Sequence, residues 1–397
     1  MHRLFSIILL LLLTVLPIPA QADDKDLLKA FLSMLDATPD WRVQWGEVID
    51  VEGRPVANDL VLSSEKVPLT VTATSLSVDG LAAGFPTAIV VNDLSTTYQE
   101  YTAKVSSITV QGINAAAFAD WLRSAKAVSG TSPPPSISGL RMAAQMIRSL
   151  SPVADVIAIN SLSFAASGKD IVTMESLTSI IDRSDAQLMS GHGGISKLVM
   201  QVDPSGGLGL ALGYERLQMG FDGRFTLDRN AGRYALDGAF KIDDGCTIMT
   251  ALVIDGVTNE ARSAIASAYF DSLDSDDGTA LVKALDKTSL SSLTFNYEDN
   301  SLARRILSMA SKQGNLPTST ISQNVAQTVQ FALQPFGSDL AASAREAAAT
   351  FLNQPGTLSI TASPDTPIPL GRLMSSRSME IVPALKLDIK ANTSRKL

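Results

Sequence analysis

Cysteine and histidine are almost absent from this sequence of 397 residues. It holds one cysteine, Cys246, and two histidines, His2 and His192. A single cysteine excludes an intrachain disulfide, so packing rather than covalent cross-linking must stabilise the fold. One histidine and one cysteine cannot assemble the usual nitrogen and sulfur ligands of a zinc site. We therefore predict that the chain has no metal site and no cofactor site.

Recognisable catalytic constellations are also missing. His192 lies in Ser190–Gly194, which predicts a flexible turn, and no Gly-x-Ser-x-Gly elbow accompanies it. Cys246 precedes a run of strand type, and this pattern predicts a buried thiol rather than a reactive one. Glu298 and Asp299 are adjacent acids, which point to opposite faces of a strand, and acids just ahead of a helix favour its start. We predict no catalytic residue and no enzymatic activity.

Two further segments resemble ligand-binding loops, but neither matches a known binding motif. Gly206–Gly213 is rich in glycine but lacks the Gly-Lys-Ser/Thr ending of a phosphate-binding loop, so it predicts a turn. The acidic segment Asp271–Gly278 resembles a calcium loop. With Gly278 at the sixth position of an EF-hand, Leu273 and Ala284 would occupy the first and twelfth, where acids are needed. A solvated acidic loop is favoured over an irregular calcium site.

Long apolar runs are confined to the first residues. Leu4–Leu16 is almost entirely apolar and is followed by a small-x-small pattern, which predicts a bacterial signal peptide at residues 1–22. Cleavage is expected after Ala22, with Ala20 as the alternative. An uncleaved anchor would need roughly 20 apolar residues. We expect no transmembrane segment after cleavage and a periplasmic location, with secretion as the alternative. The net charge of −8 argues against nucleic acid as a partner.

The main pattern in the rest of the sequence is apolar residues at alternate positions. The Ser-Leu-Thr-Phe sequence at 292–295 has echoes throughout the chain, and none of them recurs at a fixed interval. Turn residues at 228–232 and 243–245 separate three of the expected strands and predict an antiparallel meander. Strands are expected within 41–110 and at 225–227, 234–242, 246–254, 293–297, 358–362 and 385–389.

Helical periodicity interrupts this pattern. Apolar stripes predict helices after Asp24, from Asn114 to Leu122, over 137–150, from Leu302 through Ile306 and Met309, over 321–333 and over 340–351. The fold class is therefore α+β: an extended, curved antiparallel sheet with amphipathic helices packed on one face. The proline-rich segment 129–136 is either a domain boundary or an extended surface loop. As a boundary, it would separate an N-terminal β-rich lobe, 23–128, from a lobe at 137–397 that holds the meander and the C-terminal helices.

Two stretches near the C-terminus carry a resemblance. Ser-Leu-Thr-Phe-Asn-Tyr-Glu-Asp-Asn-Ser-Leu-Ala-Arg-Arg-Ile-Leu at 292–307 and Asn-Gln-Pro-Gly-Thr-Leu-Ser-Ile at 353–360, together with the leader, resemble exported proteins of unknown function from Gram-negative bacteria. The likeness is clearest over about the last 110 residues. It implies a periplasmic β-rich protein with no known catalytic residues, and a distant similarity to AsmA-like envelope proteins.

These observations favour a non-enzymatic periplasmic protein for binding or envelope maintenance, whose sheet holds a lipid or another apolar ligand. A scaffold that binds an envelope protein is the first alternative. A hydrolase of envelope polymers or esters is the second, because serine and carboxylate sites have no fixed spacing in a sequence. The sequence leaves the oligomeric state open.

Overall fold

The computed structural model describes residues 24–36, 41–64, 69–82, 85–114, 117, 135–148, 150, 152–202, 208–273, 278–374 and 381–392. The expected leader, 1–22, lies outside these ranges, as do residues 129–134 of the proline-rich segment, 118–122 of the second predicted helix and 274–277 of the acidic segment. Contacts divide the chain into two units. The first takes its described residues from 1–129, 151–181 and 193–201, and the second from 130–150, 182–192 and 202–397. The two predicted lobes, 23–128 and 137–397, stay a prediction.

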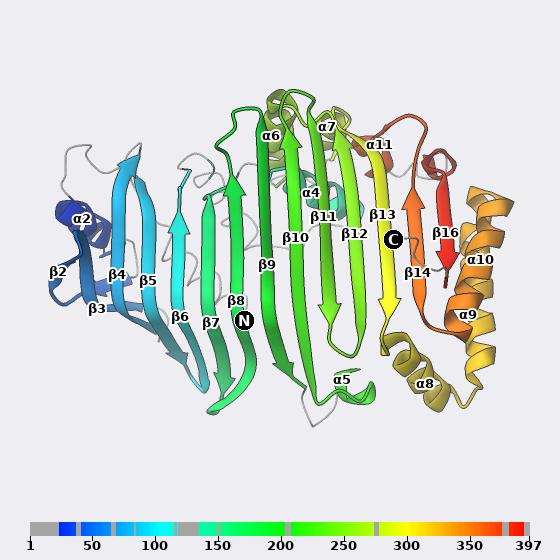
Figure 1. Ribbon diagram of the computed structural model, residues 1–397, viewed down its shortest axis with the longest axis horizontal. Helices are drawn as coiled ribbons and strands as arrows, with labels where there is room; N and C mark the ends of the chain where they lie inside the picture. Colours follow the sequence, from blue (N-terminus) through cyan, green and yellow to red (C-terminus); the bar gives the residue numbers. More distant parts are fainter. Residues whose placement is uncertain are drawn as a thin grey trace. The chain divides into compact units, whose positions relative to one another are not determined.

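In the part that the structure describes, the first unit holds helix α2 and a set of antiparallel strands (Figure 1). The strand order is β1-β3-β4-β5-β6-β7-β8, and β2 forms a hairpin with β3. The elements are α2 (Asp24–Asp36), β1 (Trp41–Gln44), β2 (Val48–Val51), β3 (Arg54–Ser64), β4 (Thr70–Ala82), β5 (Phe85–Tyr98), β6 (Tyr101–Gln111), β7 (Val156–Ala166), β8 (Lys169–Asp182) and β9 (Leu188–Gln201), of which residues 193–201 belong to this unit.

Helix α2 covers the first strands of this unit. Leu28, Phe31 and Leu32 are completely buried in one cluster with apolar residues of β3 to β6. Their spacing places them on one stripe of the helix, as the sequence predicts. The backbone N–H of Val43 donates to the Asp36 carboxylate at 2.9 Å, which ties the end of the helix to β1. This helix is confirmed.

Alternate strands of the first unit carry a left-handed residue at their centre. Asp59 in β3, Asp93 in β5, Ser161 in β7 and Lys197 in β9 have φ between 45° and 52°. Such a residue interrupts the regular pleat of its strand, while the pairing register on either side of Asp59, Asp93 and Ser161 is unchanged. The interruption allows two apolar residues three positions apart to face the same side, so Val91 and Leu94 are both buried.

Side-chain bonds join neighbouring strands beside these left-handed residues. Asn92 donates to Ser75 Oγ at 2.9 Å, and Asn160 donates to Ser107 Oγ at 2.8 Å. The sequence Asn-Asp-Leu or Asn-Ser-Leu is therefore a repeated feature of these strands. The intervals between the echoes of Ser-Leu-Thr-Phe do not reveal it.

The second unit contains the predicted meander and most of the helices. Its main strand order is β10-β11-β12-β13-β14-β16, antiparallel throughout, and β15 pairs with β13. The elements are α4 (Pro135–Arg148), α5 (Leu208–Ala211), β10 (Arg216–Asp228), β11 (Arg233–Ile242), β12 (Cys246–Asp255), α6 (Asn259–Leu273), α7 (Thr279–Leu285), β13 (Ser289–Asp299), α8 (Leu302–Gly314), α9 (Thr318–Leu333), η1 (Gln334–Phe336), α10 (Ser338–Asn353), β14 (Thr357–Ala362), β15 (Ile368–Pro369), α11 (Leu370–Met374), η2 (Val382–Leu385) and β16 (Leu387–Ala391).

The helices of the second unit form two groups. Helices α4, α6, α7 and α11 contact one another, while α9 packs on α10 and α10 packs along β16 (Figure 1). The ring of Phe351 on α10 meets the ring of Tyr297 on β13 edge to face at 5.6 Å. A strand-rich α+β chain with antiparallel sheet strands is therefore present, as predicted. The curvature of the sheet and the packing of all helices on one face stay predictions.

Several local predictions were wrong. Ser190–Gly194 lies inside β9 rather than in a turn; a Cβ on Gly193 would lie 2.7 Å from the Thr178 carbonyl, so this glycine permits a close strand approach. On α8, Ile306 is 44% exposed and Leu307 is the buried residue. On α9, the apolar stripe that predicts the helix is Ile321, Val325, Val329 and Leu333, but Val325 is 41% exposed and the buried residues are Ser322 and Ala326. Within the described part of the chain, no helix is long and apolar enough to cross a membrane.

Candidate binding face

Strand register in the second unit collects apolar side chains on one face of the sheet. Alternate residues of a strand point to opposite faces, and directly paired residues share a face. Pairing aligns Phe221, Phe240, Ile248, Tyr297 and Leu358 in one row across β10 to β14. A second row consists of Phe225, Leu236, Leu252 and Leu293. A third row ends in Phe295, Ile360 and Ile389. We call the residues of these three rows the apolar face.

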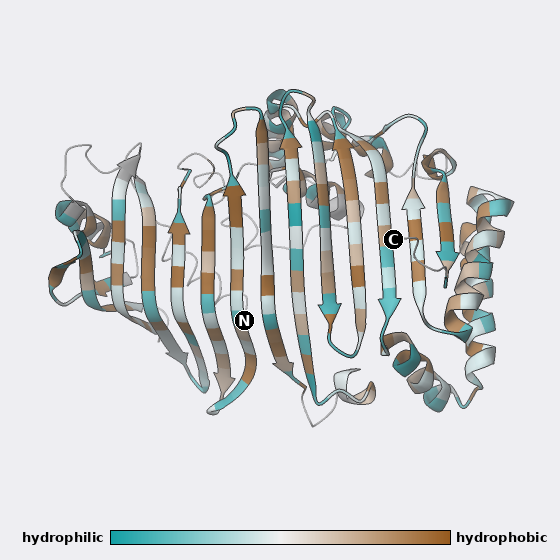
Figure 2. Cartoon of the chain, viewed as in Figure 1, coloured by the Kyte–Doolittle hydropathy of each residue, from teal (hydrophilic) through white to brown (hydrophobic). Residues whose placement is uncertain are grey.

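The opposite face of the same strands is polar. One row holds Asp222, Asn296, Ser359 and Lys390, with Ala239 and Met249 as its apolar members. Arg224 on β10 forms an ion pair with Asp237 on β11 at 2.7 Å. The alternation of apolar and polar residues along these strands can be followed in Figure 2. A sheet of this composition is expected to cover its apolar face with other groups.

One end of this apolar face is completely covered. Leu227, Tyr234, Ile254 and Leu290 form a paired row that is at most 4% exposed. A bulge at Val253/Ile254 shifts the register of β13, so that Leu290 faces the same side as Leu293. Burial of the Tyr234 hydroxyl in this row raises its pKa to about 12.

The middle of the apolar face is half-exposed. Phe221 is 45% exposed and Leu293 is 36% exposed, while Leu252 and Phe295 are partly exposed. Single exposed apolar side chains are normal on a protein surface, but contiguous ones mark sites of interaction. The face therefore presents a contiguous apolar surface that the described residues do not fully cover.

Two paired glycines shape this surface. Gly223 and Gly238 lie opposite each other in β10 and β11, where side chains would otherwise project from the apolar face. A Cβ on Gly223 would lie 3.0 Å from the Phe221 ring, and one on Gly238 would lie 3.6 Å from it. The ring therefore rests over both glycines, an arrangement that covers exposed strand backbone with an aromatic group. It makes this part of the face flat and aromatic.

A polar cluster closes the other end of the strands. The Tyr297 hydroxyl donates to Asp299 Oδ1 at 3.0 Å, and the backbone N–H of Ala303 donates to the same oxygen at 2.7 Å. The Asp299 side chain is completely buried, and its Oδ2 lies 3.6 Å from Arg304 Nε. Asp299 thus satisfies the first turn of α8. The prediction that an acid just ahead of α8 supports its start is confirmed for Asp299, although the N-cap position itself is occupied by Ser301.

This cluster lowers the acidity of its neighbours. Burial raises the pKa of the Tyr297 hydroxyl, and the Asp299 carboxylate raises it further. Burial also raises the pKa of the Cys246 thiol, with Asp299 adding to the effect while the Tyr297 hydroxyl opposes it. The thiol is 1% exposed, so the prediction that Cys246 is buried is confirmed. A protonated, buried thiol is a poor nucleophile.

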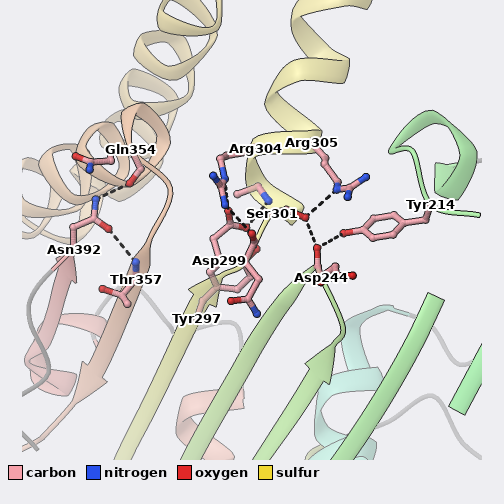
Figure 3. Close-up of polar contacts among 12 residues, drawn as sticks. Tyr214, Asp244, Tyr297, Asp299, Ser301, Arg304, Arg305, Gln354, Thr357 and Asn392 are labelled. Atoms are coloured by element: carbon pink, nitrogen blue, oxygen red, sulfur yellow. Dashed lines mark hydrogen bonds and ion pairs between the residues drawn. The ribbon is translucent and has the colours of Figure 1, made fainter. Parts of the chain in front are cut away.

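Arg305 fastens α8 to the segment before β10. Its guanidinium lies over the Tyr214 ring, 4.4 Å from the ring centre. Its Nε donates to Ser301 Oγ at 2.9 Å, and Nη1 donates to the carbonyls of Leu212 and Gly213 at 3.0 and 3.1 Å. Tyr214 and Ser301 both donate to the Asp244 carbonyl (Figure 3). No periodic pattern in the sequence predicts these contacts, because loop residues make most of them.

The remaining segments considered from the sequence are not brought together. His192 is exposed on β9, and Leu208–Ala211 of the glycine-rich segment forms the short helix α5. Among the residues that the structure describes, no three histidine, cysteine, aspartate or glutamate side chains are grouped to hold a metal ion. Tyr297 and Asp299 do meet, on one face of β13, while Glu298 points to the other.

Comparison with known proteins finds a similarity over part of this region. A family model described as "Uncharacterized protein" matches residues 239–392. The matched segment lies within the second unit and includes most of the apolar face and helix α8, while Leu212, Gly213 and Tyr214, which Arg305 contacts, precede it. No curated protein matches the chain.

Proposed function

We propose that this protein is a non-enzymatic binding protein of the periplasm, and that its apolar face holds the hydrocarbon part of a lipid or a similar apolar ligand. The observation that carries the proposal is the half-exposed middle of this face, beside a row of the same strands that is fully buried. Roughly 25 cal/mol is gained for each Å² of apolar surface removed from water. Covering this face is therefore a favourable step for a ligand.

The shape of the face favours a flexible chain over a compact molecule. Phe221 lies flat over two glycines, and the rows on either side present aliphatic and aromatic groups without a charged residue among them. The polar groups at the end, Tyr297 and Asp299, already bind each other and α8. Binding by apolar contact alone is typical of sites for acyl chains.

The periplasmic location rests on the leader at 1–22 and on the resemblance to exported envelope proteins. A role in envelope maintenance follows if the ligand is an envelope lipid. A scaffold that covers the same face with a protein partner is the second candidate, and the test below separates the two.

The proposal is tested by extracting lipid from the purified full chain and identifying it by mass spectrometry. We expect wild-type protein to retain lipid and Leu293→Asn to retain several-fold less, because the substitution places an amide in the middle of the apolar face. Leu293 is already 36% exposed, so the variant should fold.

Thr294→Asn is the matched control, since Thr294 is the next residue of β13 and points to the polar face. It should retain lipid at the wild-type level. Wild-type protein free of lipid, or equal loss in both variants, would overturn the lipid proposal. Lipid-free protein that is crosslinked through this face to one dominant partner would favour the scaffold.

A further inference from the structure

A groove lies between α8 and the segment that precedes β10. It has a volume of about 650 Å³. Ala211, Leu212 and Gly213 form one wall, and α8 forms the other. The α8 wall consists of Ser301, Arg304, Arg305, Ser308, Met309, Lys312 and Gln313. None of these residues belongs to the apolar face, so the groove is a separate site.

Positive charge is concentrated in this groove, although the chain has a net charge of −8. Arg304, Arg305 and Lys312 line it, and no acidic residue is among the described residues that line it. Arg304 is partly neutralised by Asp299 at 3.6 Å. Lys312 is exposed and has no partner among the described residues. The groove thus offers an unpaired cation to an incoming anion.

Arg305 is already held in place. Its guanidinium lies over the Tyr214 ring. Nε and Nη1 donate to Ser301, Leu212 and Gly213. Nη2 has no partner in the part of the chain that the structure describes. Gly213 has φ of 76°, and this left-handed conformation accompanies the approach of its carbonyl to Arg305. A guanidinium fixed in advance loses little entropy when it binds an anion.

Apolar groups complete the groove. Ala211, Leu212 and Met309 line it together with the cations, so the same space meets both a charged head and a short apolar segment. We propose that this groove binds an anionic amphiphile, in which a phosphate group contacts Arg305 and Lys312 and the adjoining chain contacts Leu212 and Met309. Guanidinium groups pair well with phosphate oxygens, and a lysine adds a point charge. This proposal does not depend on the proposed function of the apolar face.

Three probes separate the parts of this ligand. Dihexanoylphosphatidylglycerol has an anionic head, dihexanoylphosphatidylcholine has the same chains with a zwitterionic head, and glycerol phosphate has a head without chains. Isothermal titration of the full-length protein, below the micelle concentration of either lipid, measures each affinity. We expect the phosphatidylglycerol to bind more tightly than either of the other two.

Charge reversal tests the assignment of the site. Lys312→Glu should weaken phosphatidylglycerol binding by about tenfold and change phosphatidylcholine binding little. Lys283→Glu is the matched control, because both lysines lie in the last turn of a helix in the second unit and both are exposed. It should leave both affinities unchanged.

Each remaining outcome bears on the proposal. No preference for the anionic lipid, or equal weakening by Lys312→Glu and Lys283→Glu, would overturn it. Glycerol phosphate that binds as tightly as the phosphatidylglycerol would overturn the amphiphile and leave a site for the phosphate alone. Leu293→Asn should not affect this binding, so failure of the apolar face and failure of the groove are distinguishable.

Discussion

At the scale of single residues, Asp299 connects three parts of the second unit. Its carboxylate accepts from Tyr297 on β13 and from the first turn of α8, and its backbone N–H donates to the Gly356 carbonyl ahead of β14 at 2.7 Å. The side chain is completely buried. A residue with these bonds positions α8, and therefore also positions the groove that α8 lines.

Asp299→Ala should destabilise the second unit by roughly 2–3 kcal/mol, because it removes a helix cap and leaves the Tyr297 hydroxyl without its acceptor. The shift of the urea midpoint and faster hydrogen exchange at the α8 amides measure the effect. Asn300→Ala is the control: Asn300 is exposed and its side chain makes no bond among the described residues. Comparable exchange in both variants would contradict the role of Asp299.

At the scale of elements, tight turns set the register of the strands. Ser167 and Gly168 join β7 to β8 with φ of 50° and 77°, the two positive values of a type I′ hairpin turn. Gly112, which follows β6, has φ of 64° but also lies against Asp155. The two glycines share a conformation and differ in the space around them.

Alanine at these two positions should therefore have unequal effects. Gly168→Ala meets nothing within 4 Å and should cost only the strain of a left-handed alanine, about 1 kcal/mol. Gly112→Ala would force the added methyl group into Asp155, whose Cβ lies 2.7 Å from the new atom, and should cost at least about twice as much. Urea unfolding of the first unit compares them. Equal costs would mean that Asp155 moves aside freely.

At the scale of the whole molecule, the sequence predicted the elements better than their contacts. The meander over 225–254, the start of α8 beside Asp299 and the buried Cys246 follow from alternation, turn residues and capping, which are local. The register that aligns Phe221 with Tyr297 depends on pairing between distant strands, and no local pattern encodes it. Helix faces were misplaced by one residue on α8 and α9, since Ile306 and Val325 fit an apolar stripe as well as the buried residues beside them do.

The buried tyrosines make the stability of the whole protein sensitive to alkali. The folded-state pKa of Tyr234 is about 12, above its ordinary value of about 10, so the unfolded chain ionises first. The contribution of Tyr234 is fully present below about pH 10 and is lost as pH rises to 12. Tyr297 shifts in the same direction.

Tyr234→Phe should remove part of this dependence. Between pH 10 and pH 12 the variant is expected to lose roughly 2 kcal/mol less stability than wild-type protein, as measured by urea unfolding at each pH. Unfolding at pH 7 gives the baseline cost of losing the hydroxyl. Parallel pH curves for the two proteins would show that Tyr234 is solvated in the folded state.

The left-handed residues Asp59, Asp93, Ser161 and Lys197 recur on every second strand, from β3 to β9. Two neighbouring strands, one with such a residue and one without, therefore form the repeating element of this sheet. A sheet of this kind can grow or shrink by two strands at a time without realigning the strands that remain. Duplication or deletion of such a pair of strands can therefore change the number of strands in the sheet during evolution, while the buried apolar residues of neighbouring strands stay aligned.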